Sequence, residues 1–167
     1  MTQYGRVERL YIDPESPHFA ALQQQSKILK PDQGYHYIYR VNCGGDTYID
    51  EYGGYWQADQ PYRPMLAWGS RSWADKFNGM STNFASQRII SDPIKGTKDW
   101  PLFQTFRYGL DNLGYQFDLP NGDYFVELYF AEPWYGKFSS GKGDRVFDIA
   151  INGQVVEHQF DIYKNAE

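Results

Sequence analysis

The sequence predicts an all-β protein, an antiparallel β-sandwich of jelly-roll type with an irregular N-terminal arm. Three observations favour this class. Short segments alternate apolar and polar residues, turns rich in Gly, Pro and Asn separate them, and strands do not alternate with helix-length segments. The chain has 167 residues, which suits a single domain with its own core. We place the arm or linker at residues 1–35 and the sandwich domain at residues 36–167.

The N-terminal arm contains three prolines, a run of three glutamines at 23–25 and no sustained alternation. These features predict an extended segment outside the core. Apolar residues at helical spacing indicate one short helix within it, from Phe19 to Leu29.

Strands are expected from residue 36 onward. The first covers residues 36–43 and ends at Gly44-Gly45, and a second covers residues 47–50. Residues 55–98 follow an irregular pattern rich in Trp, Pro, Gly, Ser and Asn. Long irregular stretches inside compact domains are uncommon and are often functional.

Regular alternation returns in the C-terminal half of the chain. It predicts strands at residues 103–108, 115–119, 123–130, 146–151 and 154–162, of which 123–130 alternates most clearly. Asn152-Gly153 predicts a two-residue hairpin turn between the last two strands, since both central residues of that turn need a positive φ.

The bulk properties disfavour several partners. The formal net charge is -5, so no basic face for nucleic acid is implied. No apolar run has the length needed to cross a bilayer, so we expect no membrane partner. The N-terminus lacks the hydrophobic middle of a signal peptide, although such a signal could precede an excised segment. Cys43 is the single cysteine, which excludes an internal disulfide and a cysteine-based metal cluster.

Patterns typical of enzymes are missing from the sequence. The three histidines, at 18, 36 and 158, lack metal-ligand spacing, and there is no nucleophile elbow, P-loop or dinucleotide fingerprint. Two acids suffice for glycoside hydrolysis, but sequence alone does not bring any two together. The candidates are Asp46, Asp50, Glu51, Asp59, Asp99, Glu127, Glu132 and Asp148. We predict no catalysis and no cofactor for this chain, while its oxygen-rich loops are compatible with a structural calcium ion.

Aromatic residues make up 19% of the chain, and several fall in expected loops rather than strand interiors. Flat rings that tolerate water at one edge suit the C–H faces of pyranose sugars. Charged neighbours can then bond the sugar hydroxyls. The rings are Trp68, Trp73, Tyr108, Trp134 and Tyr135, and the neighbours are Arg71, Asp75, Arg107 and Glu132. The alternative, that these rings cap the open ends of the sandwich, is equally compatible with the sequence.

An ordered set of motifs spans residues 40–163: RVNCGG, YWQADQPY, FQTFRYG, DYFVELYFAEPWYG, VFDIAINGQVV and FDIY. The set resembles malectin and malectin-like carbohydrate-binding domains. The residue pattern of this set, with Asp99-Trp100 before FQTFRYG, looks most like malectin domains appended to bacterial β-galactosidase-type glycoside hydrolases. The resemblance implies a sandwich that binds di- or oligosaccharides in a loop-lined cleft without catalysis.

The resemblance also implies binding residues. The family's tyrosine after its ERY-like strand matches Tyr108, and its aromatic pair after Ala-Glu matches Trp134 and Tyr135. Its earlier loop tyrosine falls near WGSRSW, where Trp73 is the first choice and Trp68 the second. A late aspartate of the family has no counterpart before Glu167. We therefore expect the last strands to be missing and open sheet edges to favour self-association.

These observations lead to one main interpretation and one alternative. The chain is expected to be a non-catalytic carbohydrate-binding module that targets an attached glycoside hydrolase. The alternative is a structural or interaction domain that packs against the hydrolase catalytic domain. The parent protein is expected to be secreted, periplasmic or on the cell surface.

Overall fold

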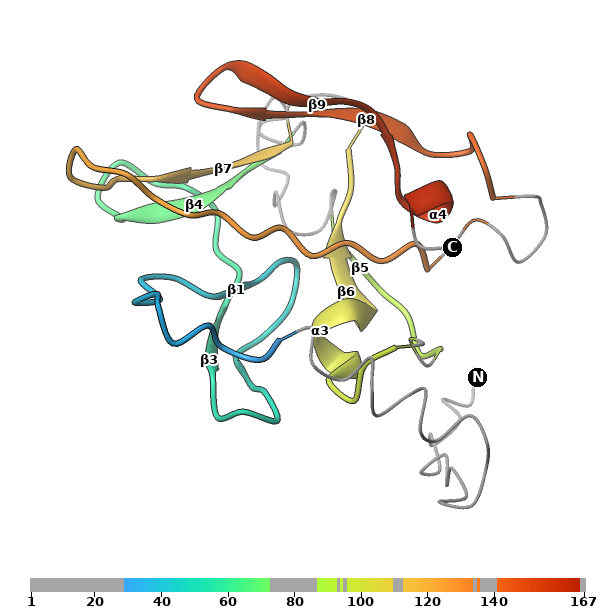
Figure 1. Ribbon diagram of the computed structural model, residues 1–167, viewed down its shortest axis with the longest axis horizontal. Coiled ribbons are helices and arrows are strands. Elements are labelled where there is room, and N and C mark those ends of the chain that lie inside the picture. Colours follow the sequence, from blue (N-terminus) through green and yellow to red (C-terminus); the bar gives the residue numbers. More distant parts are fainter. Residues whose placement is uncertain are drawn as a thin grey trace, which may run out of the picture. The chain divides into compact units, whose positions relative to one another are not determined.

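The computed structural model describes residues 29–72, 87–92, 94, 96–109, 113–133, 135 and 141–165 (Figure 1). Strands outnumber helices among them, and the two helices are short, so the predicted all-β class is confirmed. Residues 1–28, which include most of the expected arm and its helix, lie outside the described residues. The chain divides into two compact units, Met1–Gly122 and Asp123–Glu167, which we call the first and second units.

A small three-stranded sheet begins the first unit. It consists of β1 (Val41–Asn42), β2 (Tyr48–Ile49) and β3 (Tyr55–Ala58), in the order β1-β3-β2. The strand expected at 47–50 is confirmed as β2. The strand expected at 36–43 is reduced to two residues, because only Val41 and Asn42 pair with β3, and they do so in parallel.

The irregular stretch contains two further strands. β4 (Trp68–Arg71) pairs antiparallel with β7 (Gly114–Phe117), and β5 (Gln87–Ile89) pairs antiparallel with β6 (Thr105–Arg107). The strand expected at 103–108 begins later, because residues 100–104 form the short helix α3 (Trp100–Gln104). Pro101 fits the first turn of that helix, since its missing N–H is not needed there.

The second unit contains a hairpin. β8 (Val146–Ile151) and β9 (Gln154–Asp161) pair antiparallel, and the short helix α4 (Ile162–Asn165) follows. Asn152 and Gly153 have φ values of 52° and 78°, which confirms the predicted turn. The rings of Phe130, Phe147 and Phe160 pack together within this unit, with centroids 5.4–5.8 Å apart.

The strand expected at residues 123–130 is wrong. The segment runs as the orange trace that follows β7 and belongs to none of the sheets formed by the described residues (Figure 1). Alternation gives a segment two faces, but a strand also needs a neighbour to complete its hydrogen-bonded ladder. Apolar side chains of this segment are correspondingly exposed, Phe125 by 64% and Leu128 by 51%.

Polar side chains fill much of the interior that the structure describes. The buried apolar residues there are Leu29, Trp68 and Ile162, whereas buried polar or charged residues include Asp50, Asp99, Arg107 and Asp161. Buried polar groups must be hydrogen-bonded to be tolerated, so networks rather than apolar packing alone fix the loops. No helix of the described part is long and apolar enough to cross a membrane.

Candidate functional site

The predicted ligand-binding rings lie in different environments. Tyr108 follows β6 in the first unit and is half-buried, whereas Tyr135 lies in the second unit and is exposed. Trp68 is buried in β4, with 5% of its surface accessible. Trp73 and Trp134 lie outside the described residues. Tyr108 and Tyr135 are therefore the two predicted rings that the structure describes and leaves at least partly exposed.

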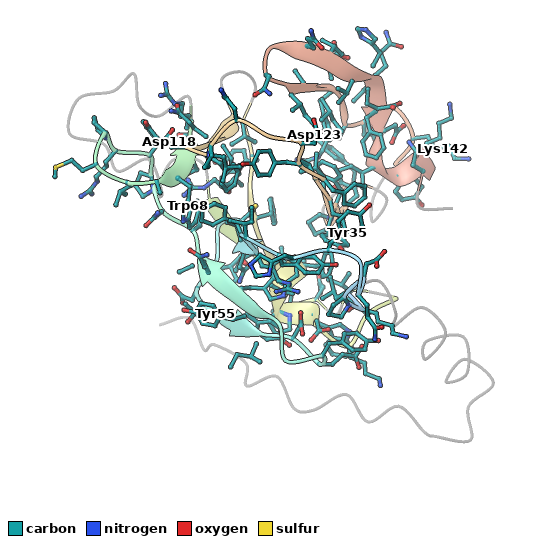
Figure 2. All side chains as sticks on the ribbon, turned by 60° about the vertical axis from the view of Figure 1, so that its left-hand side comes forward. Tyr35, Tyr55, Trp68, Asp118, Asp123 and Lys142 are labelled. Atoms are coloured by element: carbon teal, nitrogen blue, oxygen red, sulfur yellow. The ribbon has the colours of Figure 1, made fainter. Side chains whose placement is uncertain are left out.

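Trp68, labelled in Figure 2, packs inside the first unit. Its ring stacks on Phe117 at a centroid distance of 5.9 Å and lies 6.2 Å from the ring of Tyr39. Its Nε1 donates a hydrogen bond to Oε1 of Gln57 at 3.1 Å. Both the face and the polar edge of this ring are engaged by protein, which supports the packing interpretation for Trp68.

Most of the side chains predicted to bond sugar hydroxyls are already bonded to other protein groups. Arg71 donates from Nη2 to Gln116 at 2.6 Å, and Asp75 lies outside the described residues. The Arg107 side chain, which was considered as a donor to sugar hydroxyls, is buried and paired with Asp59. The Glu132 carboxylate is also largely covered, and it pairs with Arg145.

Tyr135 is held by a local charged pair. Its backbone N–H donates to Glu132 Oε1 at 3.0 Å, and Glu132 Oε2 lies 2.7 Å from Arg145 Nε. The guanidinium carbon of Arg145 lies 5.1 Å from the Tyr135 ring centroid. A cation over a ring is attracted to its negative face. One face of the Tyr135 ring is therefore engaged by Arg145.

Tyr108 follows directly after a buried charged network. Oδ2 of Asp59 accepts hydrogen bonds from the Gly44 N–H at 2.6 Å, the Tyr115 hydroxyl at 2.9 Å and Nε of Arg107. Burial alone would lower the pKa of Arg107, but the hydrogen bond and charge of Asp59 outweigh it, and the pKa is raised. Burial raises the pKa of Tyr115, so its hydroxyl stays protonated and donates.

A second acidic cluster lies in the first unit. Asp50 accepts hydrogen bonds from the backbone N–H groups of residues 52 and 54 and from Trp56 Nε1. Asp99 accepts from the Tyr48 hydroxyl and from the Glu51 N–H, both at 3.0 Å. Burial raises the pKa of Asp99 and, together with the bond to Asp99, raises that of Tyr48 to about 12. The described residues contain no group of three or more His, Cys, Asp or Glu side chains placed to hold a metal ion.

Comparison with known proteins identifies the family. The sequence model of the malectin domain matches residues 37–167. The chain belongs to the malectin domain family. This malectin domain is 29% identical over 131 residues to Malectin-A of Xenopus laevis, an alignment that covers 75% of the chain and 39% of that protein. The corresponding values for Malectin of Homo sapiens are 29% over 129 residues, 75% and 37%.

A plant protein aligns over more of the chain. Receptor-like protein 4 of Arabidopsis thaliana is 29% identical over 169 residues, which covers 95% of the chain and 24% of that protein. The malectin domain spans about two fifths of the length of its vertebrate relatives. No solved structure matches the chain.

Sequence reasoning missed the charged pairs that lie near the two tyrosines. Asp59 was considered only as a candidate acid, and its partner Arg107 lies 48 positions away. Arg145 carried no local signal, because its role depends on contact with Glu132 and Tyr135. The one available clue was the Gly44-Gly45 pair, which marks a turn that packs closely against neighbouring backbone.

Proposed function

We propose that this malectin domain is a non-catalytic carbohydrate-binding module for di- or oligosaccharides. The observation that carries the proposal is the family match over residues 37–167, joined to an exposed Tyr135 ring with one face already supported. A supported ring loses little conformational freedom when a sugar stacks on its other face. Trp73, Trp134 and Tyr108 complete the proposed set. Binding of this kind needs no cofactor.

The test is direct binding of sugars to the chain. A glycan array identifies a ligand, and titration calorimetry then compares the wild-type chain with Tyr135→Ala and Tyr108→Ala. Loss of one stacking ring is expected to weaken binding about fivefold or more, since such contacts contribute on the order of 1 kcal/mol. Tyr55→Ala is the matched control, because Tyr55 is also exposed but lies outside the proposed set. Equal affinities in all four proteins would refute the assignment.

The proposed context is a glycoside hydrolase of the β-galactosidase type in the same polypeptide. Support comes from the residue pattern at positions 99–109, which resembles that of malectin domains appended to such hydrolases. A chromogenic β-galactoside is expected to be cleaved by the natural full-length polypeptide and not by this chain. Cleavage by the chain alone would assign catalysis to the malectin domain itself.

A second candidate function is an interaction domain that packs against the hydrolase catalytic domain. The exposed apolar side chains of the second unit favour it, namely Phe125, Val126, Leu128, Val155 and Val156. The two functions differ in their response to free oligosaccharide. A carbohydrate-binding module changes its tryptophan fluorescence on titration with the sugar, whereas a docking domain responds only to the catalytic domain.

A further inference from the structure

Asp59 lies just beyond the end of β3 and joins three other segments through one carboxylate oxygen. Its donors come from the turn after β1, from the last residue of β6 and from β7. Its backbone N–H also donates to the Gly45 carbonyl at 2.9 Å. The side chains of Asp59 and Arg107 are each only 2% exposed. The Asp59 carboxylate is therefore buried, and it links these segments inside the first unit.

The turn that Asp59 binds rests directly on β6. Gly44 has a φ of +78°, and a Cβ atom placed on it would lie 2.7 Å from the backbone carbonyl carbon of Phe106. Such an approach excludes any side chain at this position. Asp59 thus holds β6 twice, through the turn that touches Phe106 and through the side chain of Arg107.

β6 is a short strand. Its pairing with β5 covers three residues and ends at Arg107, so Tyr108 follows beyond the last ladder position. The nearest side-chain anchor before Tyr108 is the Arg107–Asp59 pair. A buried charged pair resists rearrangement, since separating its partners leaves an uncompensated charge in the interior.

We propose that Asp59 is a positioning residue for ligand binding, which acts through Arg107 to fix the end of β6 and thereby the placement of Tyr108. The inference rests on the proposed function, because it assigns Asp59 to the same site. Asp59 itself is buried and bonded within the protein, and it is not expected to touch the sugar. The pair gives Tyr108 its orientation before the ligand arrives, which lowers the ordering cost of binding.

Two mild variants test the proposal in the full chain. Tyr115→Phe removes one donor to Asp59, and Arg107→Lys keeps the charge but loses the planar guanidinium. Tyr48→Phe is the matched control, since it removes a tyrosine hydroxyl that donates to Asp99 instead. Each protein is titrated with the array-selected oligosaccharide, its melting temperature is measured, and hydrogen exchange is followed in peptides covering residues 103–109.

Both network variants are expected to weaken sugar binding roughly three- to tenfold, less than the full effect of losing one hydrogen bond to a charged group, because the change reaches Tyr108 indirectly. They are also expected to speed exchange at residues 103–109. Tyr48→Phe is expected to lower the melting temperature comparably while leaving affinity and exchange at residues 103–109 near wild type. Unchanged affinity in both network variants, or an equal loss in Tyr48→Phe, overturns the positioning role.

The exchange measurement separates the inference from the proposed function. If the wild-type chain binds no sugar but exchange at residues 103–109 rises in the network variants, the carbohydrate proposal fails while Asp59 is confirmed as the anchor of β6. If the wild-type chain binds sugar and exchange is unchanged in both variants, the anchor fails while the carbohydrate proposal stands.

Discussion

In the first unit, Asp59 and Asp99 each bury one carboxylate oxygen that accepts no hydrogen bond from the described residues. In the second unit, Asp161 uses both oxygens on backbone amides, with Oδ2 accepting from Gly143 at 2.7 Å and Oδ1 from Lys164 at 3.1 Å. The pKa values of Asp99 and Asp161 are shifted in opposite directions. Burial raises the pKa of Asp99, whereas the amides at Gly143 and Lys164 lower that of Asp161.

The two units also support their tyrosines in different ways. The first unit fixes the backbone before Tyr108 with an interior pair, Asp59 and Arg107, that few solvent molecules reach. The second unit holds Tyr135 with Glu132 and Arg145, and the arginine side chain is 31% exposed. A partly exposed arginine can be rehydrated when its partner is lost, whereas a buried one cannot. We therefore expect the two pairs to differ in how much stability depends on them.

Asp59→Asn is expected to have the largest effect. It leaves the Arg107 charge buried without a counter-charge, which costs about 3–5 kcal/mol of the free energy of unfolding. Urea denaturation followed by tryptophan fluorescence measures the loss. Asp118→Asn is the control, because Asp118 is an exposed carboxylate of the same unit and its loss should change stability by less than about 0.5 kcal/mol. A loss below about 1 kcal/mol for Asp59→Asn would contradict the comparison.

Glu132→Gln is expected to have an intermediate effect. The glutamine keeps an acceptor for the Tyr135 N–H but removes the charge that faces Arg145. Because Arg145 can turn to solvent, the expected loss is about 1 kcal/mol, between the values for exposed and buried pairs. A double-mutant cycle with Arg145→Gln measures the coupling directly. A coupling as large as the loss in Asp59→Asn would remove the contrast between the two units.

The sequence was sufficient to predict secondary structure where local interactions decide it. Asn152-Gly153 predicted the hairpin turn correctly, because the positive φ values of such a turn depend on those two residues alone. The strands on both sides followed from their alternation. α3 was missed because residues 103–108 were assigned to a strand from Phe103 onward, although Asp99-Trp100-Pro101 opens a helix in the structure. Local alternation therefore found several strands, but it did not set their ends, and at residues 123–130 it predicted a strand that the structure lacks.

The candidate site was less predictable, because its support is non-local. The rings could be selected from loop position and chemistry, but burial of Trp68 depends on Phe117 and Tyr39, which come from distant parts of the chain. In the same way, the sequence marked Arg107 as a donor for sugar hydroxyls, and its partner Asp59 became visible only in the structure. Residue type indicates what a side chain can do, and packing decides whether it is available.

The smallest effects are expected from the pH dependence of Asp99→Asn and Asp161→Asn. The raised pKa of Asp99 means that the folded state binds more protons there, so its contribution is fully favourable below about pH 4 and declines as pH rises. The lowered pKa of Asp161 has the opposite sign, and its contribution is present above about pH 4 and is lost as pH falls.

Melting temperatures of the three proteins between about pH 3 and 7 test this contrast. Relative to wild type, Asp99→Asn should gain a few degrees as pH rises, while Asp161→Asn should lose a few degrees over the same range. Each asparagine variant removes only one titrating group, so the difference from wild type isolates that group. Parallel melting curves for all three would mean that neither carboxylate changes its proton affinity on folding, and the electrostatic contrast between the units would be lost.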